Sequence, residues 1–206
     1  PIQHILRHTY FMDLKFNVGP DVLIPRPETE DLVRWILDDY KLTNSQNVRI
    51  LDIGTGSGCI AISLAKNLKT SKVSAMDIST EALEIAKENA ESNEVNIDFL
   101  KADIFKIETE LQLDVIVSNP PYVRELEKYS MRKNVIENEP EVALFVSNKD
   151  PLVFYRAIAD FAQKNLISKG SLYLEINQYL GKDMVELLKK YTFKNIELRK
   201  DIFGKT

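Results

Sequence analysis

The sequence predicts an α/β fold in which a doubly wound, mostly parallel sheet follows a short β-hairpin. Three observations support this prediction. Apolar runs short enough for buried strands alternate with longer segments of helical periodicity. One strand breaks into a glycine-rich turn that opens directly into a helix, the order of a dinucleotide-binding unit. Polar residues follow several strands at their carboxyl ends, where open α/β sheets hold their ligands.

Size and composition indicate one domain and exclude several classes of function. The chain has 206 residues, of which 44% are hydrophobic, enough for one sizeable core. A net charge of −4 argues against a broad phosphate-binding surface, so we expect no direct nucleic-acid partner. The single cysteine, Cys59, and the absence of a Cys/His cluster predict no disulfide, no metal site and a cytoplasmic location. Nothing resembles a signal peptide or a membrane span, so no membrane partner is expected.

Two segments precede the predicted sheet. Residues 1–19 mix aromatic and aliphatic side chains with alternation near the end, which predicts a β-hairpin within an N-terminal unit of residues 1–24. A Pro-Arg-Pro segment then leads into a helix from about Glu28 to Tyr40. Acidic residues in the first turn of this helix suit the partial positive charge of its N-terminus. Interpreted as the start of a helix, the segment assigns no role to Arg26.

The glycine-rich turn follows the first strand of the sheet. The strand covers residues 48–53, and the turn reads Gly-Thr-Gly-Ser-Gly from Gly54 to Gly58. Glycines let the backbone pass close to a ligand, and the helix that begins at Cys59 offers unpaired N–H groups at its N-terminus. The turn therefore predicts a binding site for a nucleotide-like cofactor.

The next strand, at 72–77, ends in a carboxylate. Asp77 lies about 20 residues after the glycine turn, which is the position of an acid that binds a ribose diol. The remaining predicted elements are a helix at 80–92, strands at 96–101 and 114–118, a helix at 154–166, a turn at 169–170, a strand at 171–176, a helix at 182–191 and a strand at 195–199.

A proline-stiffened turn follows the strand at 114–118. It reads Asn-Pro-Pro-Tyr from Asn119 to Tyr122. Neither Pro120 nor Pro121 has a backbone N–H, and each restricts the residue before it, so the turn is stiff and extended. Its carbonyls can accept hydrogen bonds from a substrate –NH2 group, and Tyr122 can lie against a planar one. Taken by itself, the turn could also be a loop without function.

The segment at 123–150 is long for a connection. It carries several basic residues, among them Arg132 and Lys133, and a Glu-Pro pair at Glu139. Long ordered connections are often lids or binding loops. We therefore predict that this segment recognises a partner protein, with an ordinary solvated surface as the alternative.

These motifs, in this order, resemble those of class I S-adenosylmethionine-dependent methyltransferases that act on a planar nitrogen. The Asn-Pro-Pro-Tyr turn is shared by enzymes that methylate adenine, cytosine and glutamine. Further matches at 1–5, 24–30, 139–140 and 201–205 resemble the PrmC/HemK family, the N5-glutamine methyltransferases of class 1 peptide chain release factors. The resemblance implies a class I (Rossmann-like) methyltransferase fold, S-adenosyl-L-methionine as cofactor, and a release factor with its Gly-Gly-Gln loop as partner.

The resemblance also implies a role for each matching residue. The cofactor-binding residues are Gly54, Thr55, Gly56, Ser57 and Gly58 at the methionine and ribose side, Asp77 at the ribose hydroxyls, Asp103 and Ile104 at the adenine, and Asn119. The catalytic residues are Asn119, Pro120 and Tyr122, and the substrate-binding residues are the same three with Pro121. The Asn119 side-chain oxygen and the Pro120 carbonyl would align the substrate nitrogen, so no strong general base is needed.

The resemblance covers essentially all of residues 1–206 as one catalytic domain. Family members carry a helical domain upstream and a final strand downstream, so we expect this chain to be part of a longer protein. Two other functions share part of this pattern. A DNA or RNA amino-methyltransferase with the same turn would need a basic groove, which the net charge does not favour. A Rossmann-like binding module without activity would predict damage to the turn or to the glycine-rich loop, and both are intact.

Overall fold

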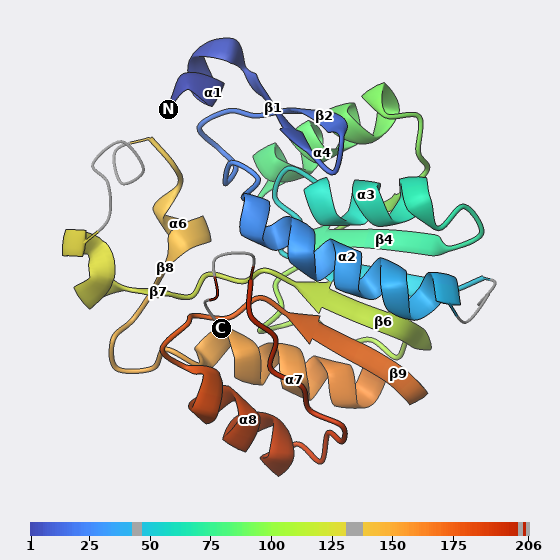
Figure 1. Cartoon of the computed structure of the whole chain (residues 1–206), viewed down its shortest axis with the longest axis vertical. Coiled ribbons are helices and arrows are strands. Elements are labelled where there is room, and N and C mark those ends of the chain that lie inside the picture. Colours follow the sequence, from blue (N-terminus) through green and yellow to red (C-terminus); the bar gives the residue numbers. More distant parts are fainter. Residues whose placement is uncertain (43–46, 131–137, 202–203, 205–206) are drawn as a thin grey trace.

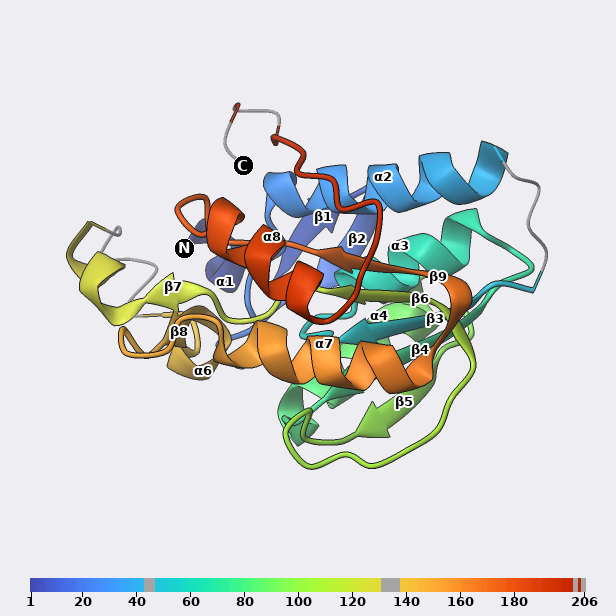
Figure 2. The same cartoon turned by 90° about the horizontal axis from the view of Figure 1, so that it is seen from below.

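A sheet of five parallel strands runs through the molecule, with helices on both faces (Figures 1 and 2). The computed structural model describes residues 1–42, 47–130, 138–201 and 204. The strands are β3 (Arg49–Ile53), β4 (Lys72–Asp77), β5 (Asp98–Lys101), β6 (Leu113–Ser118) and β9 (Leu166–Leu174). Their order in the sheet is β5-β4-β3-β6-β9, so the order reverses between β3 and β6. This arrangement confirms the predicted doubly wound sheet and puts its ligand-binding crevice beside β3 and β6.

Successive side chains of the central strands pack into different cores. The covering helices are α2 (Pro27–Leu42), α3 (Cys59–Asn67), α4 (Thr80–Ser92), α7 (Val153–Asn165) and α8 (Gly181–Lys190). Ile50 and Val115 pack with residues of α2 and α3 in one core. Leu51 and Ile116 pack with residues of α7 in the other. Because neighbouring side chains of a strand point to opposite faces, the continuous apolar runs of β3 and β6 fit a sheet covered on both sides.

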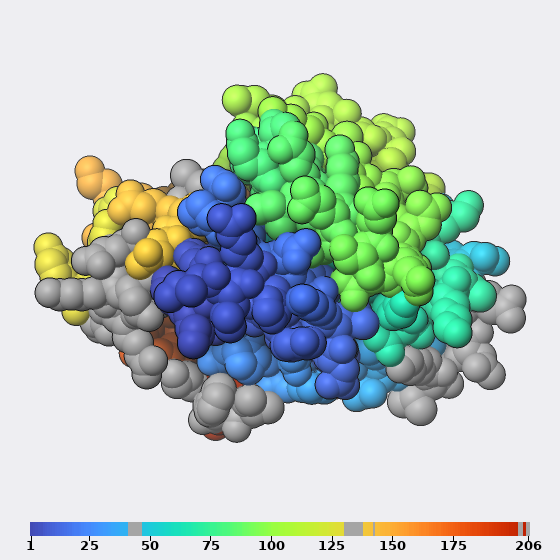
Figure 3. Space-filling view, turned by 90° about the horizontal axis from the view of Figure 1, so that it is seen from above, coloured from blue at the N-terminus to red at the C-terminus, as the bar shows by residue number. Residues whose placement is uncertain are grey.

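The N-terminal segment folds as the predicted hairpin, with a short helix before it. The helix is α1 (Ile2–Leu6), and the hairpin pairs β1 (His8–Phe11) with β2 (Leu14–Asn17). The hairpin is held to α4 by buried Asn89, whose side chain accepts from the Asn17 N–H at 2.6 Å and donates to the Asn17 carbonyl at 3.0 Å. Figure 3 shows the dark-blue hairpin lying against the green surface of the domain.

The predicted turn at 169–170 is wrong, because β9 begins at Leu166 and continues through it. A Cβ on Gly170 would lie 3.0 Å from the Leu113 carbonyl oxygen and 3.2 Å from that of Asp114. The register between β6 and β9 shifts at this point. Gly170 therefore lets β9 approach the backbone of β6 closely where the register is irregular. An isolated glycine within a strand is typical of such a close approach.

The predicted strand at 195–199 is also wrong, since this stretch has no regular structure. Asn195 adopts a left-handed conformation with φ of 53°, which interrupts an extended chain. Leu198 is 46% exposed. The stretch instead lies against α2, where the Arg199 guanidinium is 3.9 Å from the centre of the Trp35 ring.

The long connection at 123–150 contains short elements of its own. They are β7 (Val123–Arg124), the 3₁₀ helix η1 (Glu125–Ser130), α6 (Glu141–Leu144) and β8 (Phe145–Val146), and β7 pairs with β8 in parallel. Arg132 and Lys133 lie outside the described residues, as do Ile202, Phe203 and Lys205 of the terminal motif. In the described part of the chain, no helix is both long and apolar enough to cross a membrane.

Candidate functional site

A cavity of about 530 Å³ opens at the carboxyl ends of β3, β4, β5 and β6. Its volume lies within the roughly 300–1,000 Å³ range of small-molecule sites. Most of the predicted site residues line it: Gly54, Thr55, Gly56, Ser57, Asp77, Asp103, Ile104, Asn119, Pro120 and Pro121. Gly58 and Tyr122 do not. Sequence reasoning thus brought together residues from four separate strand ends, which the parallel sheet gathers at one edge.

The three glycines of the loop have different surroundings. Gly54 and Gly56 have φ of 72° and 53°, and a Cβ on either would meet nothing within 4 Å. Their backbones thus face open space, as close approach of a ligand requires. A Cβ on Gly58 would lie 2.9 Å from Ile62 Cδ1 and 3.1 Å from Ala86 Cβ. Gly58 therefore allows α3 and α4 to pack closely, and its contact with a cofactor stays a prediction.

The carboxylate of Asp77 holds the glycine loop in place. One of its oxygens accepts from the Gly56 N–H at 2.9 Å and the other from the Ser79 N–H at 3.0 Å. A carboxylate has about four lone-pair directions, so these bonds leave room for two further donors such as ribose hydroxyls. Asp77 is therefore positioned for the role predicted from the sequence and also orders the loop around it.

A second carboxylate, Asp52, is buried beneath the same loop. It accepts from the Thr55 hydroxyl at 2.7 Å. Burial raises the pKa of Asp52 to about 7, although the Thr55 hydrogen bond acts in the opposite direction. The charge state of this group therefore changes near neutral pH.

Apolar side chains form the far end of the cavity, and sequence reasoning identified one of them, Ile104. Ile78 and Phe105 line the cavity and are 62% and 49% exposed, while Phe154 packs on Phe105 with ring centroids 5.1 Å apart. Exposed large apolar residues in a cavity favour a flat apolar ligand group. The sequence could have indicated these two residues, because Ile78 directly follows Asp77 and Phe105 directly follows Ile104, both predicted site residues.

Asp103 caps the turn that presents these residues. It accepts from the Phe105 N–H at 3.0 Å and lies 3.3 Å from the Lys106 ammonium. The Phe105 hydrogen bond is the main reason that the pKa of Asp103 is lowered. Asp103 therefore stays ionised at the mouth of the cavity.

Arg26 now has a role, which is to fix one wall of the cavity. Its Nη2 donates to both carboxylate oxygens of Glu139, at 2.7 and 2.8 Å, and the Glu139 side chain is fully buried. Pro140, the next residue, and Ala143, in α6, line the cavity. The ion pair therefore ties the segment at 138–144 to the start of α2.

The Asn119 side chain joins a group of hydrogen bonds that connects three elements. Its Nδ2 donates to the Thr29 hydroxyl at 3.2 Å, and that hydroxyl donates to Glu175 Oε2 at 2.7 Å. The Tyr122 hydroxyl donates to the other oxygen of Glu175, Oε1, at 2.8 Å. Thr29 belongs to the first turn of α2, Asn119 and Tyr122 follow β6, and Glu175 follows β9. Thr29 and Glu175 were not predicted as site residues.

Desolvation raises the pKa of Glu175, an effect that its hydrogen bonds with Thr29, Tyr122 and Asn119 oppose. Burial, with the nearby Glu175 carboxylate as a second cause, raises the pKa of Tyr122 well above its ordinary value. Tyr122 is therefore a neutral hydrogen-bond donor and a planar surface, and it does not act as a base.

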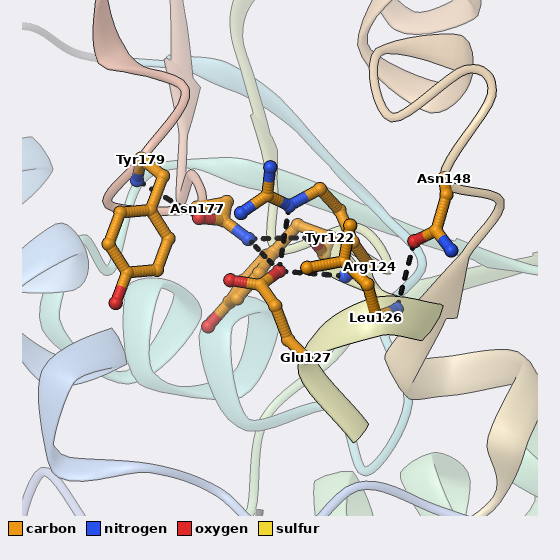
Figure 4. A network of polar contacts seen from close by, with 7 residues as sticks. All are labelled: Tyr122, Arg124, Leu126, Glu127, Asn148, Asn177 and Tyr179. Atoms are coloured by element: carbon orange, nitrogen blue, oxygen red, sulfur yellow. Dashed lines mark hydrogen bonds and ion pairs between the residues drawn. The ribbon is translucent and has the colours of Figure 1, made fainter. Parts of the chain in front are cut away.

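A larger cavity of about 910 Å³ lies beside Tyr122, the last residue of the turn. Tyr122 and Glu175 line it, and Arg26 lines both cavities. Figure 4 shows the polar network on its rim. Asn177 Nδ2 donates to the Tyr122 carbonyl at 3.0 Å and to Glu127 Oε2 at 2.8 Å, and Glu127 also accepts from Arg124. The network thus fixes the backbone of Tyr122 through its carbonyl oxygen.

Within residues 1–42, 47–130 and 138–201, no group of three or more His, Cys, Asp and Glu side chains is arranged to hold a metal ion. The Asn-Pro-Pro-Tyr turn offers hydrogen-bond acceptors beside the smaller cavity.

Comparison with known proteins gives consistent results. Residues 36–144 match the model of the methyltransferase small domain. The chain is 56% identical over 206 residues to a release factor glutamine methyltransferase of Flavobacterium psychrophilum, covering 99% of this chain and 72% of that protein. It is 49% identical to the protein of the same name from Bacteroides thetaiotaomicron, covering 100% and 73%. A methyltransferase structure from Pyrococcus furiosus superposes with a TM-score of 0.65 at 23% identity, covering 92% and 83%, and supports the fold.

Proposed function

The chain belongs to the release factor glutamine methyltransferase family and is an enzyme that methylates a release factor glutamine; on this premise we propose the cofactor, the acceptor atom and the residues involved. The methyl donor is S-adenosyl-L-methionine. The acceptor is the side-chain amide nitrogen, N5, of the glutamine in the Gly-Gly-Gln motif of class 1 release factors. The observation that carries this proposal is that Asn119 and Pro120 line the smaller cavity together with Gly54, Gly56 and Asp77, while Tyr122, at the end of the same turn, lines the larger one.

The residues of the smaller cavity fit S-adenosylmethionine. The open backbones of Gly54 and Gly56 leave space that a side chain would fill, and Asp77 offers oxygens to a diol. Ile78, Ile104 and Phe105 provide apolar surface for an adenine ring. When bound, the cofactor supplies an electrophilic methyl group on its sulfonium.

The acceptor amide would lie at the Asn119–Tyr122 turn, whose last residue, Tyr122, also lines the larger cavity. A carboxamide nitrogen is a weak nucleophile because its lone pair is delocalised into the carbonyl, so positioning is the main task of the protein. The Asn119 side-chain oxygen and the Pro120 carbonyl accept the two N–H bonds of the substrate –NH2 group. These acceptors direct the nitrogen lone pair toward the smaller cavity and stabilise the positive charge that develops on the nitrogen. The half-buried ring of Tyr122 supports the amide plane, and the proton leaves the nitrogen after transfer.

Radiolabel transfer tests the proposal. Tritiated S-adenosylmethionine is incubated with the chain and three acceptors: a class 1 release factor, the same factor with the Gly-Gly-Gln glutamine changed to alanine, and duplex DNA. We expect label in the first acceptor and none in the second, with mass spectrometry locating one methyl group on that glutamine. Label in the alanine variant would reject the proposed acceptor atom. Label in DNA at a comparable rate would instead support a nucleic-acid amino-methyltransferase.

A further inference from the structure

The hydrogen bonds among Glu175, Thr29 and Asn119 have a defined direction. Both oxygens of the Glu175 carboxyl group accept, one from the Tyr122 hydroxyl at 2.8 Å and the other from the Thr29 hydroxyl at 2.7 Å, so Thr29 uses its one proton for Glu175. The Thr29 oxygen then has only lone pairs left for Asn119, which must present its –NH2 group, at 3.2 Å. The side-chain oxygen of Asn119 is thereby turned away from Thr29.

This direction matters because an asparagine side chain can rotate by half a turn at little steric cost. The rotation exchanges an acceptor for a donor of almost the same shape. A substrate –NH2 group needs an acceptor, and it would meet the –NH2 group of a rotated Asn119. Something in the site must therefore select one of the two orientations.

We propose that Thr29 and Glu175 are positioning residues that fix the amide orientation of Asn119 and so present its oxygen to the substrate –NH2 group. The inference rests on the proposed function and deepens it. Thr29 is 2% exposed, so water does not compete well for its hydroxyl. Tyr122 holds the second oxygen of Glu175 at 2.8 Å, which keeps the carboxylate directed at Thr29. Neither positioning residue needs to touch the reacting atoms.

Substitutions at Thr29 separate the hydroxyl from the bulk of the side chain. Thr29→Val keeps the shape and removes the hydroxyl that accepts from Asn119, so the orientation of the Asn119 amide is fixed less firmly. We expect kcat for release-factor methylation to fall by at least about tenfold, while the Kd for S-adenosylmethionine, measured by calorimetry, changes by less than about threefold. Thr29→Ser restores a hydroxyl and is expected to recover most of the lost rate.

A double-mutant cycle tests whether Thr29 acts through Asn119. In an Asn119→Ala background there is no amide to orient, so Thr29→Val should change the remaining rate by less than about twofold. An equal loss in both backgrounds would show that Thr29 supports the fold in general and would overturn the proposal. A Thr29→Val enzyme with wild-type kcat would overturn it as well.

A measurement without substrate distinguishes this inference from the proposed function. The ¹⁵N–¹H signals of the Asn119 side chain are assigned by their loss in Asn119→Ala. We expect Thr29→Val and Glu175→Gln to shift these signals and Thr29→Ser to leave them close to their wild-type positions. If the wild type transfers no methyl group to a release factor, the proposed function fails, whatever the signals do. If transfer is normal and the signals do not respond to Thr29→Val, the positioning role fails by itself.

Discussion

Arg26 and Glu139 lie 113 residues apart in the sequence, yet one guanidinium nitrogen of Arg26 donates to both oxygens of the Glu139 carboxylate. The Glu139 side chain is fully buried and also accepts from the Ile24 N–H at 3.3 Å. The pair thus joins the segment before α2 to the wall of the smaller cavity. Removing the cation from a buried carboxylate lowers the stability of the fold, so the contribution of this pair can be measured.

Arg26→Met should lower the free energy of unfolding by about 2–3 kcal/mol, because it leaves the buried Glu139 charge without its main partner. Urea denaturation measures this loss. Arg34→Met, in α2, is the matched control, since Arg34 is half-exposed and pairs with Glu30 at the surface, where such pairs contribute about 0–1 kcal/mol. Similar losses of unfolding free energy in the two variants would show that the Arg26–Glu139 pair stabilises the fold no more than a surface ion pair does.

Asn89 is the second long-range connection that can be tested. Its side chain satisfies both the N–H and the carbonyl of Asn17 and donates to the Ser57 carbonyl at 2.9 Å, so it links the hairpin to the glycine loop. Asn89→Ala should cost roughly 2–4 kcal/mol, because buried backbone groups lose their partners. Glu88→Ala, an exposed change one residue away, is the control. Equal unfolding midpoints for the two variants would contradict this role.

Asp52 predicts a pH dependence of stability. Its pKa is about 7 in the folded chain against 3.8 for the ordinary group, so the folded state binds the proton more tightly than the unfolded state does. The contribution of Asp52 to stability is therefore complete below about pH 4 and is lost as pH rises through 7. Relative to the wild type, Asp52→Asn should become more stable over this interval, by at most about 4 kcal/mol.

Urea denaturation of the wild type and Asp52→Asn at half-unit steps from pH 4 to pH 8 measures this difference. Asp98→Asn removes an exposed carboxylate of β5 and serves as the control, for which we expect no comparable trend. A constant difference between Asp52→Asn and the wild type across the interval would contradict the raised pKa.

Asp77 should contribute to cofactor affinity in two ways, through ribose hydroxyls and through the Gly56 N–H that it accepts. We expect Asp77→Ala to weaken S-adenosylmethionine binding by about 1–3 kcal/mol in calorimetry, the usual loss for charge-assisted hydrogen bonds. Asp77→Asn keeps one acceptor oxygen and should lose less. Equal affinities of the wild type and Asp77→Ala would remove Asp77 from the site.

Residues that act within one local motif could be predicted from the sequence, and partners far along the chain could not. Runs such as 114–118 predict buried strands because their apolar residues suit a sheet covered on both faces. Thr29 stands in the first turn of a helix, where a polar residue is already explained by the helix terminus. Its real partner, Glu175, is 146 residues away, and only the sheet order brings β9 beside β6. The predicted turn at Gly170 was wrong for a related reason. An isolated glycine is typical of a turn and also of an irregular strand, and the neighbouring strand that distinguishes the two is far along the chain.

Asn119 is where the proposed chemistry depends most on one side chain. Asn119→Ala should leave the fold and most of the cofactor affinity intact, because Pro120 and Pro121 still stiffen the turn. We expect kcat for release-factor methylation to fall by on the order of 10² or more, since an acceptor that aligns the nitrogen is lost. Single-turnover kinetics with saturating cofactor measure the step, and calorimetry checks that the cofactor still binds.

Asn119→Asp is the more informative change. It keeps an oxygen for the substrate –NH2 group, but it removes the donor to Thr29 and brings a second carboxylate close to Glu175. Like charges at this distance disfavour each other, so the aspartate should hold its orientation less well than the asparagine. We therefore expect a rate between those of the wild type and Asn119→Ala. A wild-type rate in Asn119→Ala would show that the turn does not align the acceptor nitrogen as proposed, because one of its two acceptors would then be dispensable.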